Sequence, residues 1–583
     1  MKHFFFLKSS LYRNFHLYCI SLLFALTCVS HTHAQQQSAL LPLPNHISER
    51  KGKAFSVKEG TTAIYVNDES LNFAAEQLAA IIKKEMGLSL AMSVEQKEEG
   101  RLDKQTRKSI NKQSPKGARA LAGIQLLIVN KANDILADNS KVPTTSNQSN
   151  AFATSSQRYT LEVNTRQLII KGASPQAVFY GIQTLHQLLI GNPCATAKKE
   201  ISPIYIEDEP RFAYRALMLD PARHFLPVDD VKFYIDQMAR YKYNVLQLHL
   251  TDDQGWRVEI MSRPELASKE HYTQNELKDL IAYAAQRHIE IVPEIDIPGH
   301  TVAILAAYPE LGCTTADTIA KKVGETVNLM LCASVDKVYD VYQDIFREMA
   351  EIFPSKHIHL GGDESVIEKN WARCKRCQQQ MKDRGYTKAS QLMIPFFDKM
   401  LAMVKQVGKS PVLWCELDNI YPPANEYLFP YPTHVTLVTW RNGLTPKCIE
   451  LTRKHGNPLI MAPGEYTYFD YPQLKGDLPE FNNWGMPITT LEQAYSFDPS
   501  YGLTQAEQAH IQGVMGTLWG EAMPDINRVT YMTYPRALAL AEAGWTQMEH
   551  RTWDSFKQRM YPNLYTLMKA GVSIRVPFEI IKR

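Results

Sequence analysis

Two different patterns of hydrophobic and polar positions divide the chain near residue 210. Before that point, short apolar runs predict strands, and segments with apolar residues every three or four positions predict helices. The strand-like runs are 62–66, 124–129, 159–163 and 167–170, and the helical segments are 72–84 and 174–189. This mixture predicts a compact α+β domain over residues 38–205. Two polar stretches, 96–116 and 137–157, interrupt the pattern and predict surface loops.

From residue 212 onward, apolar strand-like runs alternate with helical segments. The runs are 216–219, 245–250, 289–297, 357–360, 411–414, 435–440, 458–462 and 514–519. The helical patterns include 228–241, 274–287, 335–352 and 389–407. Eight such units predict a (β/α)8 TIM barrel over residues 210–583, ending in a C-terminal helix. A doubly wound open sheet is the alternative, but eight similar units in one run favour closure.

Length and charge narrow the classes of function. The 583 residues are too many for one ordinary domain, which agrees with the division into two. The formal net charge is only +3, from 64 basic and 61 acidic residues, so nucleic acid is not an expected partner. Aromatic residues make up 10% of the chain. This aromatic content without basic excess fits neutral, ring-shaped ligands such as sugars, although a large core alone would also account for it.

The first 34 residues predict a cleaved export signal. A cationic start precedes the apolar stretch 18–30, which is too short to span a bilayer, and a small-residue cleavage site ends at Ala34. We therefore expect an exported protein, periplasmic or extracellular. A lipid anchor on Cys28 is the alternative, but Thr27 before it replaces the usual small residue. No other apolar stretch reaches about 18 residues, which predicts no membrane span in the mature chain.

Nine cysteines are present, and seven of them follow the export signal. Cys374 and Cys377 form a CxxC pair, which is half of a zinc site, and whether these two pair with each other stays open. No second CxxC and no close histidine pair completes it, so we expect neither a metal nor another cofactor. Cys313 and Cys332 flank a polar loop, and for an exported protein this predicts a disulfide between them.

Acidic residues and indoles follow the predicted barrel strands, where barrel enzymes place their active sites. In strand order they are Asp220 and Arg223; His249, Asp252 and Asp253; Glu294, Asp296 and His300; Asp363 and Glu364; Trp414 and Glu416; Trp440; Glu465, Tyr468 and Asp470; and Trp519 and Glu521. The chain has no phosphate loop and no nucleophile elbow. Carboxylates accept hydrogen bonds from hydroxyl groups, and indoles stack on the C–H faces of sugar rings, so the pattern predicts a carbohydrate site.

The segment 357–365, HIHLGGDES, resembles the catalytic HxGGDE motif of glycoside hydrolase family 20, the β-N-acetylhexosaminidases. The similarity extends to RALMLDPARHF…HLTDDQGW at 215–256, PEIDIPGHT at 293–301, YFD at 468–470 and LWGE at 518–521. Residues 38–205 also resemble the small α+β domain that precedes the barrel in this family. One departure is Met515, where many members have Gln, and we expect only local repacking there.

The resemblance implies a role for each matching residue. Glu364 is similar to the general acid/base, and Asp363 to the residue that orients and polarises the 2-acetamido group. Asp252 and His300 resemble the relay that holds Glu364. The implied substrate-binding set is Arg223 and Glu521 on the outer hydroxyls, Tyr468 on the acetamide carbonyl, Asp470 on a sugar hydroxyl, and Trp414, Trp440 and Trp519 as the walls and floor of the pocket. His359 is expected in the core, and Glu294 and Asp296 as supports of the site.

The adjacency of Asp363 and Glu364 agrees with the mechanism of that family. Most retaining glycosidases place two carboxylates about 5–5.5 Å apart on opposite sides of the anomeric carbon. Neighbouring residues on one loop cannot readily straddle a sugar in that way. The resemblance instead implies substrate-assisted, retaining hydrolysis, in which the sugar's own acetamide is the nucleophile. It further implies exo action on terminal, non-reducing GlcNAc or GalNAc of glycans.

Two other functions stay open at this point. A relative that releases disaccharide units, of the lacto-N-biosidase type, would need a more open pocket. A catalytically silent glycan-binding protein could use the same scaffold, because a fold does not fix a function. The sequence does not distinguish GlcNAc from GalNAc, which differ only at the 4-hydroxyl, and it gives no oligomeric state.

Overall fold

The computed structural model describes residues 39–94, 123–129, 154–314, 318–319, 329–416, 429–475, 477 and 486–578. The predicted export signal and Cys28 lie outside these residues. So do the two predicted surface loops, except for Thr154–Gln157, which form a short 3-10 helix.

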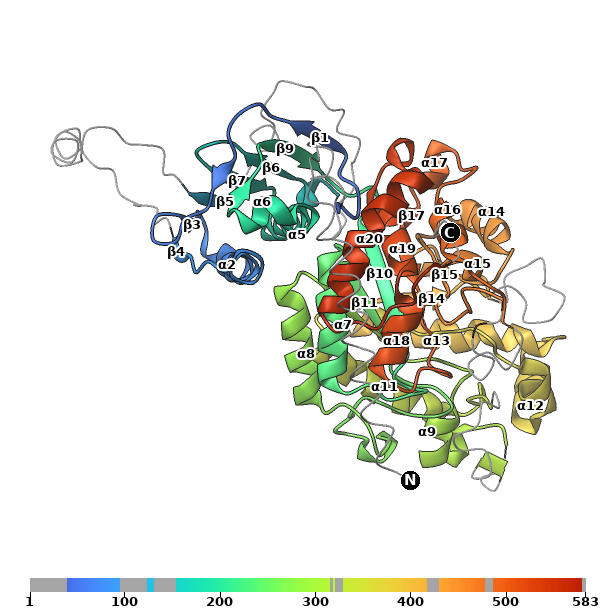
Figure 1. The fold of residues 1–583 in the computed structure, drawn as a ribbon. Coiled ribbons are helices and arrows are strands. Elements are labelled where there is room, and N and C mark those ends of the chain that lie inside the picture. The colour runs from blue at the N-terminus through green and yellow to red at the C-terminus, as the bar shows by residue number, and fades with distance from the viewer. Residues whose placement is uncertain are drawn as a thin grey trace, which may run out of the picture.

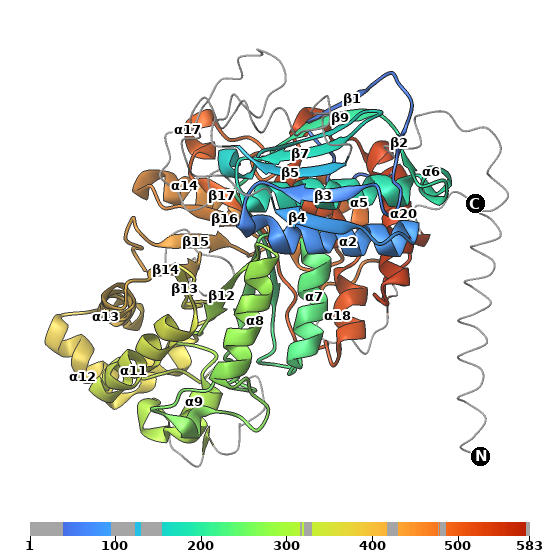
Figure 2. The same cartoon turned by 90° about the vertical axis from the view of Figure 1, so that its left-hand side faces the viewer.

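The N-terminal domain is a seven-stranded mixed sheet with helices on one face (Figure 2). In sheet order the strands are β1 (His46–Glu49), β9 (Ile204–Asp208), β6 (Tyr159–Val163), β7 (Leu168–Gly172), β5 (Ile124–Ile128), β3 (Ala63–Val66) and β4 (Ala91–Val94). The helices are α2 (Asn72–Met86), α5 (Pro175–Gly191) and the short α6 (Pro193–Ala197). A small ribbon of β2 (Phe55–Ser56) and β8 (Glu200–Ile201) completes the domain.

A buried polar cluster around Asp208 joins this domain to the barrel. Asp208 Oδ2 accepts hydrogen bonds from Tyr159 Oη (2.6 Å) and from Lys242 Nζ (3.0 Å), and Asp208 Oδ1 accepts one from Trp545 Nε1 (2.9 Å). Tyr159 and Asp208 belong to the sheet, whereas Lys242 and Trp545 belong to the barrel domain. All four side chains are buried, so each polar atom needs a partner, and the bonds from Lys242 and Trp545 to Asp208 cross the boundary and fix how the two domains dock.

The second domain is a closed parallel barrel (Figure 1). Its strands are β10 (Tyr214–Leu219), β11 (Val245–His249), β12 (Glu290–Glu294), β13 (His357–His359), β14 (Ser410–Trp414), β15 (Thr436–Thr439), β16 (Leu459–Met461) and β17 (Ile511–Gly516). β10 pairs with β11 on one side and with β17 on the other, which closes the ring. The predicted barrel, with a small α+β domain before it, is therefore confirmed.

Helices surround the barrel and carry its long loops. They are α7 (Val228–Arg240), α8 (Gln274–Gln286), α9 (Val302–Ala307), α11 (Asp336–Ile352), α12 (Lys375–Arg384), α13 (Met393–Gln406), α14 (Thr445–His455), α15 (Gly464–Thr467), α16 (Leu491–Ser496), α17 (Gln505–Gln508), α18 (Ile526–Thr533), α19 (Arg536–Trp545) and α20 (Trp553–Lys569). The helix predicted at 389–407 begins instead as a 3-10 turn, Ala389–Leu392, and becomes α-helical at Met393. Pro395, which has no N–H, then falls in the first helical turn, where none is needed.

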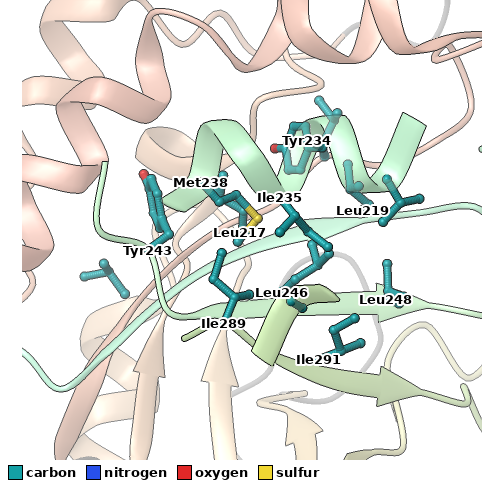
Figure 3. Close-up of a cluster of buried hydrophobic side chains, with 14 of the residues drawn as sticks. Leu217, Leu219, Tyr234, Ile235, Met238, Tyr243, Leu246, Leu248, Ile289 and Ile291 are labelled. Carbon is teal, nitrogen blue, oxygen red and sulfur yellow. The ribbon is translucent and has the colours of Figure 1, made fainter. Parts of the chain in front are cut away.

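Successive strand residues face opposite sides of the barrel wall. Leu217 and Leu219 of β10 point outward and pack with Ile235 and Met238 of α7 (Figure 3). Ala216 and Met218 point inward, where they join a second apolar cluster that also contains Trp414 and Met515. The interior is therefore filled by side chains up to the level of Trp414, and the functional residues lie above that floor. Met515 is buried in this interior.

The predicted Cys313–Cys332 disulfide does not form in the structure. All seven cysteines within the described residues are free thiols. Cys332 is close to two other cysteines, with its Sγ 3.5 Å from Cys377 Sγ and 3.9 Å from Cys374 Sγ. These separations far exceed the bonded sulfur distance of about 2.05 Å. The prediction paired two cysteines across one loop, whereas folding gathers four.

Candidate active site

The predicted site residues all lie at the carboxyl ends of the barrel strands. Strand by strand, Asp220 and Arg223 follow β10, Asp252 follows β11, His300 follows β12, Asp363 and Glu364 follow β13, Trp414 ends β14, Trp440 follows β15, Tyr468 and Asp470 follow α15 after β16, and Trp519 and Glu521 follow β17. Closure of the barrel brings these eight strand ends around one mouth.

Asp252 is the centre of a buried ionic network. Its Oδ2 lies 2.9 Å from Arg223 Nη2 and 2.8 Å from His249 Nε2, and its Oδ1 lies 3.3 Å from His300 Nδ1. Burial alone would raise the pKa of Asp252, but the guanidinium of Arg223 and the imidazole of His300 hold it well below the usual value. Asp252 is therefore an anion that fixes three neighbouring side chains.

His300 connects that anion to Glu364. Its Nε2 lies 3.7 Å from Glu364 Oε2, on the opposite side of the ring from Asp252. Burial opposes the charge of the imidazole, yet Asp252, Asp296 and Asp363 raise the pKa of His300 well above its usual value. The Glu364 side chain is 44% exposed, so its carboxyl faces the open mouth of the barrel. The side chains lie in the order Asp252, His300, Glu364.

The backbone is strained at both ends of the His300–Glu364 contact. His300 has φ of +52° and Glu364 has φ of +44°, a region that non-glycine residues seldom occupy. Each such residue costs on the order of 1–3 kcal/mol and persists only where the surrounding structure holds it. Here the strain directs one side chain from each loop toward the other.

Asp363 is buried beside its exposed neighbour. Its Oδ1 has no hydrogen-bond partner among the described residues. Burial raises the pKa of Asp363; His300 opposes that shift and the charge of Glu364 adds to it. A buried carboxylate oxygen without a partner is costly, which is typical of a position where a ligand supplies the missing donor.

Asp296 supports the backbone that carries this pair. Its Oδ1 accepts a hydrogen bond from the Gly362 N–H (3.1 Å). Burial and the negative charge of Asp363 raise the pKa of Asp296 well above its usual value. Gly361 passes so close that a Cβ there would lie 1.7 Å from Asp296 Oδ1, and its φ is +62°. Only glycine fits at position 361, and Gly362 has φ of +97°, which also favours glycine.

Glu294 organises the floor of the pocket. Its Oε1 accepts a hydrogen bond from Trp414 Nε1 (2.8 Å), and its Oε2 accepts one from Gln247 Nε2 (2.8 Å). His249 Nδ1 lies 3.0 Å from Oε2, and His359 Nδ1 lies 3.2 Å from Oε1. The sequence predicted a support at Glu294 and a core position for His359. In the structure, Glu294 fixes the Trp414 ring, and His359 is buried against that carboxylate.

Aromatic rings form the opposite side of the mouth. The Trp519 ring centre lies 5.7 Å from that of Trp414 and 6.3 Å from that of Tyr468. Arg223 Cζ lies 4.9 Å from the Trp519 ring, so the guanidinium is held by an aromatic face as well as by acids. Trp440 packs against the same cluster as Trp519 and Tyr468. These side chains present ring faces and edges of the kind that contact sugar C–H groups.

Two aromatic side chains in this wall have buried donor atoms that can bind a ligand. Neither Tyr468 Oη nor Trp440 Nε1 donates a hydrogen bond to an acceptor among the residues that the structure describes. The Trp519 indole interacts with the Tyr468 hydroxyl, but an indole can only donate, so the Tyr468 proton stays available to a ligand. Buried phenol and indole groups normally find partners. Together with Asp363 Oδ1, they give the pocket two donors and one acceptor that the protein leaves unused.

Acidic residues near the rim bind Arg223 or can accept hydrogen bonds from the hydroxyl groups of a ligand. Arg223 Nη1 donates to Asp220 Oδ2 (2.7 Å), and its Nε lies 3.4 Å from Glu521 Oε1. Glu521 is 41% exposed and can accept from a ligand as well. The backbone N–H of Trp519 donates to Asp470 Oδ1 (3.5 Å), and burial, followed by the charge of Glu521, raises the pKa of Asp470 to about 8.

Arg441 and Glu416 form a second ion pair near the site, which the sequence interpretation did not assign. Arg441 Nη2 lies 3.0 Å from Glu416 Oε1. Burial, together with the charge of Asp363, raises the pKa of Glu416 to about 8 although Arg441 opposes the shift. Arg441 Cζ also lies 4.2 Å from the Trp440 ring, so it braces that indole. The signal was an Arg directly after an indole at a strand end, but an Arg in a loop is too common to single out.

Several groups of His, Cys, Asp and Glu in the described residues are close enough to ligate an ion. Three of them are made from the pocket residues His249, Asp252, Glu294, Asp296, His300 and Asp363, with Asp253. There the carboxylates already face His side chains, and Arg223 supplies a positive charge that would repel a cation. The fourth group, made of four cysteines, lies outside the pocket.

Comparisons with known proteins identify the family of the chain. The family model described as glycosyl hydrolase family 20, catalytic domain, matches residues 212–548, and that of domain 2 of the same family matches residues 37–209. A β-hexosaminidase of Akkermansia muciniphila is 38% identical over 432 residues, which cover 70% of this chain and 84% of that protein.

Solved structures extend the similarity to nearly the whole chain. The N-acetyl-β-hexosaminidase of Streptomyces plicatus in complex with thio-NAglucal is 27% identical with a TM-score of 0.72, covering 94% of this chain and 97% of that one. The exo-β-N-acetylglucosaminidase of Vibrio harveyi in complex with N-acetylglucosamine is 26% identical with a TM-score of 0.72, covering 94% and 80%.

The chain belongs to glycosyl hydrolase family 20. It is a glycosidase, and the relatives support β-N-acetylhexosaminidase activity, so the predicted family and enzyme class are confirmed. Among the described residues, no helix combines the length and the apolar character that crossing a bilayer requires.

Proposed function

We propose that this enzyme removes terminal, non-reducing N-acetylhexosamine from glycans, with the acetamide of the substrate as the nucleophile. One arrangement carries the proposal: the buried, unpartnered Asp363 Oδ1 adjoins the half-exposed Glu364, and the Tyr468 hydroxyl, whose proton no protein acceptor takes, lies in the same mouth. One acid is thus placed for a group inside the pocket, and the other for a group at its opening.

In the first step the acetamide oxygen attacks the anomeric carbon, and the glycosidic C–O bond breaks. Glu364 gives its proton to the departing oxygen, so the leaving group departs as an alcohol. The product of the attack is a cyclic oxazolinium ion. Asp363 accepts the acetamide N–H and stabilises the positive charge that develops on it, while the Tyr468 hydroxyl donates to the acetamide oxygen and aligns it.

In the second step Glu364, now a carboxylate, takes a proton from water. The resulting hydroxide equivalent attacks the anomeric carbon, the bond to the acetamide oxygen breaks, and Glu364 is protonated again. Two inversions give net retention. His300, with its raised pKa, alternately shares its N–H with Glu364, and Asp252 holds the ring for that exchange.

Exo action follows in this proposal from the acids at the rim. Arg223 and Glu521 come from strands β10 and β17, which are neighbours in the closed barrel. Their polar atoms suit the hydroxyls at the far side of one sugar ring, and Asp470 suits a further hydroxyl. A sugar ring bound in this way abuts the pocket wall on one side, so the rest of the glycan can extend only past Glu364. Glycans that end in N-acetylhexosamine are the substrates that this pocket fits.

Three substrates distinguish this proposal from its alternatives. An aryl N-acetyl-β-glucosaminide should be hydrolysed with the β-anomer formed first, as seen by NMR. The corresponding aryl β-glucoside, which lacks the acetamide, should be a very poor substrate although it is smaller. A chitin oligomer should release monosaccharide from its non-reducing end. Disaccharide release would favour the lacto-N-biosidase alternative, and binding without turnover would favour the silent glycan-binding protein.

We further propose that the protein is exported, on the evidence of the cationic start and short apolar stretch in residues 1–34. Edman or mass-spectrometric analysis of the natural protein should find an N-terminus at Gln35. An N-terminus at a lipid-modified Cys28 would instead establish the anchor, and an intact Met1 would exclude both.

A further inference from the structure

Four cysteines from separate parts of the chain meet outside the active-site pocket. The Sγ atoms of Cys313, Cys332, Cys374 and Cys377 all lie within 4.8 Å of one another. Cys332, Cys374 and Cys377 are buried, and Cys313 is partly buried. We propose that this cluster binds one zinc ion as a closed, structural tetrathiolate site.

The distances between the sulfur atoms favour a zinc ion over a disulfide. Three are 3.5 Å (Cys332–Cys377), 3.8 Å (Cys313–Cys377) and 3.9 Å (Cys332–Cys374). Zinc binds thiolate at about 2.3 Å with tetrahedral geometry, so neighbouring sulfurs in such a site are about 3.8 Å apart. A disulfide needs sulfurs at about 2.05 Å and joins only two of them. These three separations are close to the edge of such a tetrahedron, and the remaining pairs lie within 4.8 Å.

The backbone around the cluster is fixed by bonds that do not involve the thiols. Cys332 N–H donates to Leu311 O (2.7 Å), and Gly312 and Leu331 form an antiparallel bridge. Trp371 Nε1 donates to Leu331 O (2.7 Å), which ties the segment before Cys374 to the one before Cys332. The four ligand positions are therefore held in place by the fold.

Local charge favours thiolates at two of the four positions. Cys374 is the N-cap of α12 and Cys377 lies in its first turn. The positive end of the helix dipole stabilises negative charge there and lowers the cost of ionising a thiol. Arg376 lies between them, donates to Gly312 O (2.5 Å), and interacts with Cys332 and Cys374. Its positive charge offsets part of the net −2 of a zinc tetrathiolate.

The ion would join the two loops that carry the catalytic relay. Cys313 and Cys332 belong to the segment after β12, which also carries His300, and the Leu331 N–H donates to Pro298 O (3.0 Å). Cys374 and Cys377 belong to the segment after β13, which carries Glu364. The His300–Glu364 contact spans the same two segments. The zinc site therefore acts as a clamp on the relay, without touching substrate.

Metal analysis of the full-length enzyme, purified without a metal-affinity column, tests the proposal. Plasma mass spectrometry should find about one zinc per chain, falling to less than about a tenth in Cys374→Ser and in Cys377→Ser. Cys194→Ser, which removes an exposed thiol elsewhere, is the matched control and should keep its zinc. Denaturing mass mapping without reduction should find no disulfide among the four cysteines. A Cys313–Cys332 or Cys374–Cys377 bond in the metal-free native enzyme would overturn the proposal.

A measurement on the wild type guards against variants that fail to fold. Removing the metal with a strong chelator should lower the melting temperature, and adding zinc should restore it. Cobalt in place of zinc should give the visible absorption bands of a tetrahedral tetrathiolate centre. Cys313→His, which keeps a zinc-binding group at the most accessible position, should retain the ion. Four free thiols with no bound metal, and a melting temperature indifferent to chelator, would contradict the proposal.

Discussion

The two halves of the barrel mouth are built from different chemistry. Strands β10–β13 contribute a network of buried ions around Asp252, which includes Arg223 and His300 and reaches Glu364. Strands β14–β17 contribute rings, chiefly Trp440, Trp519 and Tyr468, beside the Glu416–Arg441 ion pair and the acids Asp470 and Glu521. The charged half holds its members by short contacts among themselves. The aromatic half presents ring surface and two unused donors, Tyr468 Oη and Trp440 Nε1, and Asp363 Oδ1 in the charged half is likewise left for a ligand.

We therefore assign stabilisation of the transition state chiefly to the charged half and binding of the sugar ring chiefly to the aromatic half. Groups in the charged half act on protons and on charge that develops during the reaction, so changes there should lower kcat. Flat ring surface contacts the substrate equally before and during reaction, so changes there should raise KM. Tyr468 is the exception, because its free hydroxyl lies on the aromatic side but is assigned to the acetamide.

The largest effect is expected for Glu364→Gln. Loss of the general acid should lower kcat/KM about 10²–10⁴-fold for a substrate with a poor leaving group. An activated aryl leaving group needs no proton and should recover most of that loss. Steady-state kinetics on a series of aryl N-acetyl-β-glucosaminides measures the dependence on leaving-group pKa. Equal losses across the whole series would remove Glu364 from the role of acid.

Asp363→Asn should lower kcat by about 10²–10³-fold whatever the leaving group, since the defect lies in the attack and in the charge it creates. Burial and the charge of Glu364 raise the pKa of Asp363, so wild-type activity should fall with acidification at a pH above the usual value for Asp. The variant should lose that limb of the pH profile. Rescue of the variant by a good leaving group would show that the two carboxylates share one role.

Arg223→Ala should lower kcat/KM, with a loss of transition-state stabilisation of at most a few kcal/mol. This is the scale of removing one charge-assisted hydrogen bond at a buried site. Three carboxylates then lose their partner, so thermal unfolding must be followed in parallel. Arg223→Lys keeps the charge and separates the loss of cation from the loss of the forked geometry. Release of internal oligomers from chitin chains by the wild type would show that this side of the pocket is open.

Trp440→Leu tests the aromatic half alone. Removal of one ring from the wall should raise KM about tenfold, which corresponds to about 1.4 kcal/mol of binding free energy. The kcat should stay within about threefold of the wild-type value. The control is Tyr501→Leu, because the Tyr501 side chain is highly exposed and its loss should change neither kcat nor KM. Trp371→Leu would not serve, since Trp371 is buried in the core. A loss confined to kcat would contradict the division between the two halves.

The smallest effect concerns stability against pH at Asp470. Burial and Glu521 raise its pKa to about 8 in the folded protein, against about 3.9 in an unfolded chain. The folded state therefore binds the proton more tightly, which favours folding at low pH, and the advantage is lost as pH rises from about 4 to about 8. Asp470→Asn removes that loss. Its melting temperature, measured at pH 5 and pH 8, should change less between the two than that of the wild type.

Most of the fold and the central residues could be predicted from the sequence, because both depend on local pattern. Eight apolar runs predicted the barrel, and the rule that sites lie at strand ends located Asp363, Glu364 and His300 at the mouth. The start of α13 was shifted because Pro395 restricts the helix, an effect that the apolar pattern alone does not carry.

What the sequence could not supply was contact between distant segments. Cys374 and Cys377 match half of a zinc-site pattern, but the sequence predicted no metal because nothing near them completes it. Cys313 and Cys332 have no motif spacing, and only the folded loops bring the four cysteines together. Likewise, the pairing of Arg441 with Glu416 depends on how two adjacent strands present their ends. Polar side chains in loops show no period, so their partners emerge only from the folded chain.

The central claim is that the substrate's acetamide, rather than an enzyme carboxylate, attacks the anomeric carbon. Replacing the hydrogens of the N-acetyl methyl group with one, two and three fluorines weakens the carbonyl oxygen as a nucleophile while leaving the leaving group and the sugar ring unchanged. The account predicts that kcat/KM falls steeply with each fluorine and that the α-anomer never appears first. A rate that is indifferent to fluorination, or a covalent glycosyl ester trapped on Asp363 or Glu364, would contradict it.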